Sequence, residues 1–292
     1  MVTKVTGLPG ASVNRDFAIR RASWLSLKLQ NLGLHGDRLM WWCNTEPANF
    51  GDWIGPLIFR HQRGSWPVLA PVYMRPNRAP VHLAAGSILD AVSVPDVAVI
   101  WGTGIMSRDV CFAAPREIRA VRGPLTAVRC RELGHACPDV FGDPGIVLPR
   151  YLPMRADSDV RLGVIPHFVD QPAARALFGD REDLLLLDVT RSVEEVVADI
   201  QRCAALVSSS LHGVIVAHAF GRPCAWVEFG DSLAGDGTKF ADYFLSAGLD
   251  APPDPARIGA GTTPEELERL ARAAPLPDLS RQADRLLDAC PF

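Results

Sequence analysis

The chain has 292 residues, of which 48% are hydrophobic and 22% charged, and its formal net charge is -3 at pH 7. This length suits two α/β domains of ordinary size better than one hydrophobic core, and the mixed composition excludes an intrinsically disordered protein. The near-neutral charge provides no broad basic surface, which argues against a nucleic-acid partner.

The amino-terminal sequence lacks the continuous apolar stretch of a secretory signal, and no run of about 18 apolar residues is present to span a bilayer. Seven cysteines are scattered along the chain, with no CxxC pair and no spacing typical of a disulfide framework. We therefore predict a cytoplasmic protein without a transmembrane segment, and peripheral association with a membrane stays open.

In the first half of the chain, short apolar runs alternate with segments of helical length. This alternation is typical of βαβ units, in which helices cover both faces of a parallel sheet. Strands are predicted at 38–43, 81–85, 97–101 and 118–121, and helices at 52–63 and 124–133. Gly134 follows the second helix at the position where a C-cap favours glycine.

The second half repeats the alternation after a segment, 148–159, that contains two prolines and no apolar periodicity. Such a segment is typical of a linker, so we expect an amino-terminal domain over 1–155 and a carboxyl-terminal domain over 156–292. Both domains should be α/β and Rossmann-like. Later strands are predicted at 162–165, 184–187, 205–208 and 224–229, helices at 193–203, 211–220 and 240–247, and bracing helices at 264–272 and 279–289 after an irregular connector, 250–263.

The segment LVSSSLHG, residues 206–213, combines a buried strand, a serine-rich turn and the start of a helix. Serines before a helix cap its free N–H groups, and these groups together with the helix dipole can also hold an anion. Ser209 and Ser210 are therefore candidates for capping or for anion binding. His212 would lie at the positive end of the helix, where a histidine can bind phosphate or move a proton.

Arg122 lies between a short apolar run and the pair Gly123–Pro124, which suits the beginning of a helix. An arginine at this place can hold a carboxylate or a phosphate with two parallel hydrogen bonds. A surface salt bridge explains the same residue equally well.

Polar residues also surround two other predicted junctions between a strand and a helix. Asn49 and Asp52, in the sequence NFGD, begin a predicted helix, where Asp52 can cap the helix or act as a base on a hydroxyl group. His167 and Asp170 directly follow a predicted strand, and Asp170 can cap the next helix. Because ligands of doubly wound sheets bind beyond the carboxyl ends of the strands, we expect these residues near a site.

Three other motifs carry less information. Gly102 and Gly104 lack the third glycine and the downstream acidic residue of a dinucleotide fingerprint, so we expect no nicotinamide cofactor. Asp157 and Asp159 form a DxD triplet, but they fall in the predicted linker rather than after a strand. The histidines show no HExxH pattern, and we predict no bound metal.

Taken together, the segments NFGD, AAGSIL, WGTGI, VRGPLT, GDPGIVLP, VIPHFVD, SSSLHGVIVAHAFGRP and KFADYF stand in the order and spacing typical of polysaccharide pyruvyl transferases. The resemblance covers residues 38–248 and is greatest to the branch that decorates bacterial exopolysaccharides, which includes succinoglycan and xanthan ketal-forming enzymes. It implies a GT-B-like fold, with two Rossmann-like domains around a cleft that holds the active site. It also implies phosphoenolpyruvate as the donor substrate, with no metal or other cofactor.

The resemblance implies donor-binding roles for Arg122 and His212. Ser210 stands where some members of the family have an arginine, and Lys239 is a candidate for the missing cation. The acceptor would be an oligosaccharide or a lipid-linked glycan of a bacterial exopolysaccharide, two hydroxyl groups of which form a ketal with pyruvate as phosphate leaves. His212 is then the candidate proton donor, with Asp52 and His167 as candidate catalytic groups at the sugar and Asn49 as a candidate binding residue.

Two other functions fit the sequence. A GT-B glycosyltransferase that uses a nucleotide sugar is favoured by Ser210 in place of a cation. A non-catalytic module that binds an anion or a glycan is the third candidate. Thermal shifts with phosphoenolpyruvate and with nucleotide sugars separate the first two, because a ligand of the folded state raises its melting temperature.

Overall fold

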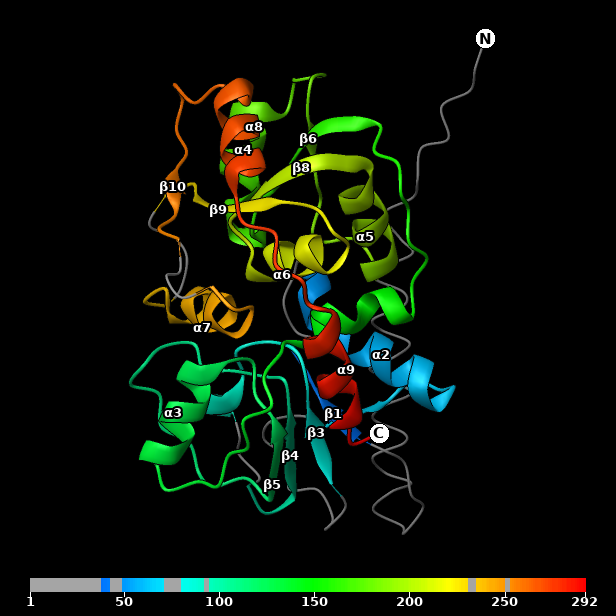
Figure 1. The fold of residues 1–292 in the computed structure, drawn as a ribbon, viewed down its shortest axis with the longest axis vertical. Coiled ribbons are helices and arrows are strands. Elements are labelled where there is room, and N and C mark those ends of the chain that lie inside the picture. Colours follow the sequence, from blue (N-terminus) through cyan, green and yellow to red (C-terminus); the bar gives the residue numbers. More distant parts are fainter. Residues whose placement is uncertain (1–37, 43–48, 71–79, 92–94, 231–234, 250–252) are drawn as a thin grey trace.

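The computed structural model describes residues 38–42, 49–70, 80–91, 95–230, 235–249 and 253–292. Within these residues the chain forms two five-stranded sheets, with helices packed against each of them (Figure 1). The α/β class is confirmed, and the two sheets are consistent with two Rossmann-like domains. The sequence at the amino terminus and the predicted strand residue Cys43 lie outside the described residues.

The first sheet has the strand order β2-β1-β3-β4-β5, and all of its pairings are parallel. Its inner strands β1, β3 and β4 are buried along their whole length, as expected for a parallel sheet, and only β4 is apolar throughout, because β1 contains Arg38 and β3 contains His82. The bounds are β1 (Arg38–Met40), β2 (Val68–Leu69), β3 (Val81–Leu83), β4 (Ala98–Trp101) and β5 (Glu117–Ala120). The two-residue strand β2 was not predicted, because so short an element has no measurable periodicity.

Helical segments of the amino-terminal half, up to residue 155, lie close to their predicted positions. The predicted helix at 52–63 begins as a 3-10 helix and becomes α-helical at Ile54. The elements are η1 (Phe50–Trp53), α2 (Ile54–Arg63), η2 (Leu89–Ala91), η3 (Pro95–Val97), α3 (Pro124–Glu132) and η4 (Pro144–Arg150). The prediction of an irregular linker from residue 148 is wrong at its start: Leu148 belongs to η4 and is buried, because this segment packs against α6.

The second sheet has the order β10-β9-β8-β6-β7 and is also parallel throughout. Its strands are β6 (Val160–Ile165), β7 (Leu185–Leu186), β8 (Cys203–Ser208), β9 (Cys224–Glu228) and β10 (Ala256–Arg257). The helices of this half are η5 (Phe168–Asp170), α4 (Gln171–Phe178), α5 (Val193–Arg202), α6 (Leu211–Ala219), α7 (Thr238–Ser246), α8 (Pro264–Ala273) and α9 (Ser280–Asp288). Strand β10 lies within the connector predicted to be irregular, and α4 was not among the predicted helices.

Helix α6 is buried from Leu211 to His218, so it has no solvent-facing side. Its sequence, LHGVIVAHA, is apolar around the whole circumference, as expected for a helix packed on several sides. Strand β8 and helix α5 contact it from its own half, and η4 contacts it from the amino-terminal half. The first turn of α6 is therefore held at the junction between the two halves.

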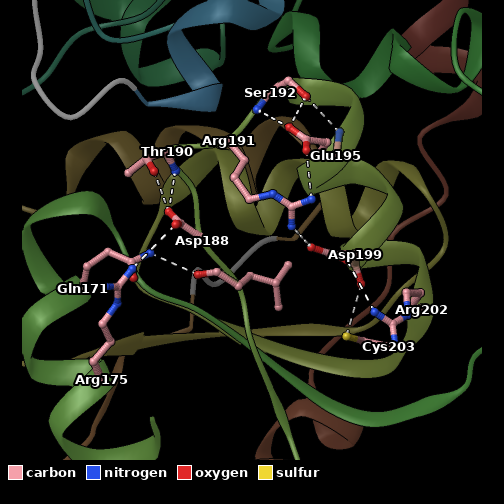
Figure 2. Close-up of polar contacts among 11 residues, drawn as sticks. Gln171, Arg175, Asp188, Thr190, Arg191, Ser192, Glu195, Asp199, Arg202 and Cys203 are labelled. Atoms are coloured by element: carbon pink, nitrogen blue, oxygen red, sulfur yellow. Dashed lines mark hydrogen bonds and ion pairs between the residues drawn. The ribbon is translucent and has the colours of Figure 1, made fainter. Parts of the chain in front are cut away.

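A polar network fixes the connection between β7 and α5 (Figure 2). The carboxylate of Asp188 accepts hydrogen bonds from the backbone N and the Oγ1 of Thr190, at 3.0 and 2.7 Å. Ser192 and Glu195 then form a capping box that begins α5. Between these groups, the carbonyl of Val189 accepts a hydrogen bond of 2.9 Å from the backbone N of Phe50, so the connection also holds η1 of the other half.

The last helix, α9, packs against η4 of the amino-terminal half. The indole Nε1 of Trp101 in β4 donates a hydrogen bond of 2.7 Å to the carbonyl of Leu286 in α9. Phe292 contacts the rings of Phe59, His82 and Trp101. The end of the chain thus packs on the amino-terminal half. Among the described residues, no helix combines the length and the apolar character needed to cross a bilayer.

A buried ion pair joins α3 to α7 across the junction. The carboxylate of Asp242 accepts from the Nε of Arg122 at 3.1 Å, and both side chains are fully buried. The same carboxylate accepts from the backbone N and the Oγ1 of Thr126, at 3.0 and 2.6 Å. Asp242 thus places a negative charge at the amino terminus of α3, where the helix dipole favours it.

Removal of the guanidinium should destabilise the fold strongly. Arg122→Ala leaves the Asp242 carboxylate buried without its cation, which we expect to lower the free energy of unfolding by about 3–5 kcal/mol. The exposed pair of Arg119 and Glu117 provides the control, and Arg119→Ala should cost about 1 kcal/mol or less. Denaturant unfolding of both variants measures the difference, and equal losses would contradict a structural role of the buried pair.

Candidate functional site

The serine-rich turn between β8 and α6 closes the end of the second sheet. Ser210 caps α6, because its Oγ accepts a hydrogen bond of 3.4 Å from the backbone N of Gly213. A side chain at Gly213 would come within 2.3 Å of the Oγ of Ser208, which explains the glycine. The expected cap at the start of α6 is therefore present and is provided by Ser210.

Ser209 has a different task, because it connects the turn to the segment after β6. Its Oγ donates to Asp170 Oδ2 at 2.6 Å and accepts from the backbone N of His167 at 2.9 Å. The hydroxyl therefore holds His167 and Asp170 beside the amino terminus of α6. Asp170 does not cap α4 with its side chain, contrary to one expectation from the sequence.

His212 lies in the first turn of α6 and is only 7% exposed. Its Nε2 is 3.6 Å from Oδ2 of Asp143, a carboxylate that is completely buried. Its ring and that of Phe50 form a T-shaped pair, with 6.5 Å between the ring centroids. The Nδ1 side lies against Gly51, where an added Cβ would be 2.0 Å from Nδ1. The imidazole is thus confined by residues of the amino-terminal half.

Asp52 lies beside this histidine on η1, and Asn49 orients it. The Oδ1 of Asn49 caps η1 by accepting from the backbone N of Gly51, and its Nδ2 donates to Asp52 Oδ2, both at 3.4 Å. Burial raises the pKa of Asp52 to about 6, against the opposing effects of the His212 charge and the Asn49 hydrogen bond. Asp52 is thus a carboxylate that exchanges its proton close to neutral pH.

His167 and Lys239 approach from η5 and α7. Burial lowers the pKa of His167 to about 4, with smaller contributions from the charges of Lys239 and His212. Burial also lowers the pKa of Lys239 to about 8, assisted by the charge of Arg122 and opposed by that of Asp170. These mutual effects show that the two histidines, the lysine and Asp170 belong to one electrostatic environment.

Arg122 lies next to this environment, but its guanidinium has partners within the chain. Besides the bond to Asp242, Nη1 donates to Ser87 Oγ and Nη2 donates to the carbonyl of Ile105, both at 2.6 Å. A side chain at Gly104 would collide with the guanidinium, so glycine there makes room for it. Arg122 does form a salt bridge, with Asp242, but the pair is buried rather than on the surface as expected. Donor binding by Arg122 stays a prediction.

Two acidic residues of the site received no role from the sequence. Asp143, in the GDPG segment, directs one carboxylate oxygen toward His212, and Asp242, in the KFADYF segment, pairs with Arg122. Both lie within segments that carry the family resemblance in the sequence, and this position was the signal that could have identified them. Their partners are distant in the chain, so the pairing itself could not be seen.

The structure thus brings Asn49, Asp52, His167, Ser209, Ser210, His212 and Lys239 to the junction between the halves. A helix amino terminus, a buried lysine and a histidine can together hold an anion. A histidine close to two carboxylates can also transfer a proton. The site is therefore equipped for acid and base chemistry on a negatively charged ligand.

The absence of a side chain at Gly51 should be essential to the position of His212. Gly51→Ala must displace the imidazole, and we expect a loss of about 1–3 kcal/mol in the free energy of unfolding together with shifted imidazole resonances. Gly261→Ala is the control, because a Cβ there meets no atom within 4 Å. Unchanged His212 resonances in Gly51→Ala would refute this packing.

The chain is similar to a known protein family and to several known proteins. Residues 98–231 match the family model of polysaccharide pyruvyl transferase. The chain is 24% identical over 239 residues to the succinoglycan biosynthesis protein ExoV of Rhizobium meliloti, covering 78% of this chain and 70% of that protein. A solved structure, the Klebsiella pneumoniae protein KP1_0663, aligns with a TM-score of 0.44 and 11% identity over 87% of this chain and all of that one.

A viral relative is more similar in sequence but over a shorter region. The uncharacterized protein L143 of Acanthamoeba polyphaga mimivirus is 33% identical over 159 residues, which are 52% of this chain. The match spans 55% of that protein, or about half of its length. On the family match and the similarity to the succinoglycan protein, the chain resembles the polysaccharide pyruvyl transferase family.

Proposed function

We propose that this protein transfers pyruvate from phosphoenolpyruvate to two hydroxyl groups of one sugar in a bacterial exopolysaccharide or its precursor, forming a pyruvate ketal. The observation that carries the proposal is the confinement of His212 at the start of α6, between Asp143 and Gly51 and beside Asp52. The match of residues 98–231 to the family model and the similarity to a succinoglycan biosynthesis protein support it. In this proposal the halves act as the domains of a GT-B enzyme, and the substrates meet at their junction.

The donor would bind through its two negative groups. Phosphoenolpyruvate carries a carboxylate and a phosphate, whose hydration must be replaced by cations and N–H donors. Lys239 and His212 supply the cationic groups, and the first turn of α6 supplies backbone N–H groups. Lys239 would thereby replace the arginine that some family members have at the position of Ser210.

Arg122 would support this site without contacting the donor. Each of its three nitrogens already donates a hydrogen bond within the chain, so we assign the direct donor contacts to Lys239 and His212. Its ion pair with Asp242 holds α7, and Lys239 lies on the same helix. The charge of Arg122 also contributes to the lowered pKa of Lys239.

The reaction needs an acid at the donor and a base at the acceptor. His212 would give a proton to the methylene carbon of phosphoenolpyruvate, which makes the adjacent carbon electrophilic. One sugar hydroxyl adds to that carbon, and a second displaces phosphate. Each of the two sugar hydroxyls loses a proton. One of these protons returns to His212, and the other leaves on the phosphate. Asp52 is mostly ionised at neutral pH and would accept the first, while His167, neutral at that pH, would orient the sugar.

Incubation with phosphoenolpyruvate and candidate oligosaccharides tests the proposal directly. Mass spectrometry should detect a pyruvate-sized addition to the acceptor, with an equal amount of phosphate released, and the reaction should continue in the presence of a chelator. Transfer from a nucleotide sugar, with none from phosphoenolpyruvate, would establish a glycosyltransferase instead. Binding of either donor without turnover would indicate a binding module.

Donor affinity should depend on the charge of Lys239. Below its pKa of about 8 the ammonium is present, so the KM for phosphoenolpyruvate should rise as the pH increases above 8. In Lys239→Arg the rise in KM should begin at a higher pH, because a guanidinium keeps its charge. Lys239→Met should weaken donor binding about tenfold or more at pH 7. The exposed Arg281, changed to Met, is the control.

The same pKa shift predicts that Lys239→Met leaves the fold intact. A pKa lowered by burial means that the charged lysine weakens folding below pH 8, and folding gains stability as the pH rises toward 10.5, the usual value. Loss of the charge should therefore not lower the melting temperature. A lower melting temperature with unchanged donor affinity would show that Lys239 is only a packing residue.

Asp52 should set the acidic limit of activity. Because its pKa is about 6, kcat/KM should fall as the pH decreases through 6 and the carboxylate takes up a proton. Asp52→Asn should reduce turnover about 10²-fold or more and abolish this limb of the pH profile. Asp96→Asn, an exposed carboxylate at the other end of the first sheet, should change neither. An unaltered acidic limb in Asp52→Asn would exclude Asp52 as the base.

A further inference from the structure

A buried carboxylate faces His212 from the amino-terminal half. Asp143 is 0% exposed, and its Oδ1 accepts a hydrogen bond of 2.9 Å from the backbone N of Gly145. Its Oδ2 is 3.6 Å from Nε2 of His212. Within the described residues, neither of these two atoms has a hydrogen-bond partner.

The backbone around Asp143 fixes this carboxylate independently of any ligand. Gly142 has a φ of 148°, a value that favours glycine, and its N donates to the carbonyl of Val121 at 3.0 Å. Asp143 caps η4. Gly145 lies so close to α6 that an added Cβ would be 2.9 Å from Cγ2 of Ile215. The turn is thus wedged between the end of β5 and α6.

Other ionisable groups surround Asp143 and His212. Tyr243, on α7, is kept neutral because burial and the charge of Asp143 raise its pKa well above the usual value. Asp52 on η1 and His167 on η5 also act electrostatically on His212, and burial holds His167 neutral. Among the described residues, His212 is the basic group within 4.0 Å of Asp143. A buried carboxylate is costly unless a neighbouring donor compensates it.

We propose that Asp143 is a positioning residue, which keeps a proton on Nε2 of His212 and so assigns proton transfer to Nδ1. The inference rests on the proposed function. A carboxylate accepts hydrogen bonds, so the facing nitrogen must carry hydrogen, and a neutral imidazole carries only one. Nδ1 is then the basic nitrogen of the neutral ring and the acidic N–H of the charged ring. Histidines in metal and hydrolase sites are oriented by carboxylates in the same way.

The proposed proton transfer balances with this assignment. The Nδ1–H bond of the imidazolium breaks as a C–H bond forms at the methylene carbon, using the electron pair of the carbon–carbon double bond. His212 becomes neutral and keeps its Nε2–H toward Asp143. A proton from a sugar hydroxyl, relayed by Asp52, later restores the imidazolium.

Asp143→Asn tests the inference, since asparagine retains the size of the side chain and an oxygen that can cap η4. We expect turnover to fall by about 10²-fold or more while the KM for phosphoenolpyruvate changes by less than about threefold. Imidazole nitrogen NMR of the ligand-free protein should show the Nε2–H tautomer of His212 in the wild type and its loss in the variant. Asp139→Asn, an exposed carboxylate nearby, is the matched control.

A double-mutant cycle separates positioning from a purely structural role. If Asp143 acts through His212, Asp143→Asn should have little additional effect on turnover in a His212→Gln background. Additive losses would overturn the inference, as would wild-type His212 resonances in Asp143→Asn. The NMR experiment needs no turnover. If the protein transfers no pyruvate but the tautomer of His212 still depends on Asp143, the proposed function is refuted. The inference that Asp143 positions His212 would then still hold.

Discussion

The buried ion pair between Arg122 and Asp242 is the interaction on which the rest of the site depends. Its partners are 120 residues apart and belong to different halves of the chain. Desolvation of two charges is expensive, and here it is offset by further hydrogen bonds: Thr126 donates to Asp242, and Arg122 donates to Ser87 and to the carbonyl of Ile105. Because the pair fixes α7 against the start of α3, it also determines where Lys239 lies relative to the other ionisable groups.

A second constraint is the complete burial of α6. An apolar helix at the junction has few arrangements available, so its first turn cannot shift without disturbing both halves. His212 lies in this first turn and is therefore held in place, and Gly51 and Asp143 of the other half lie against its ring. The site therefore has two kinds of components: a rigid histidine close to two carboxylates, and a buried lysine whose charge depends on pH near neutrality.

The sequence predicted the alternation of strands and helices well, because long apolar runs such as those of β4 and β8 reflect burial on both faces of a sheet. Short elements such as β2 and β10 depend on pairing rather than periodicity and were missed. Among the site residues, Asp52 and His212 were identified from the local signals of helix starts. The partners Asp143 and Asp242 could not be recognised, because their function arises from contacts between distant segments.

The position of the donor phosphate is the most direct test of this account. A crystal structure of the protein with phosphoenolpyruvate, or with an unreactive analogue, should show the phosphate within hydrogen-bond distance of Lys239 and the backbone N–H groups that begin α6, with His212 in contact with the ligand. The methylene carbon should then face Nδ1 of the imidazole. A phosphate bound away from α6, with His212 and Lys239 making no contact to the ligand, would contradict the account.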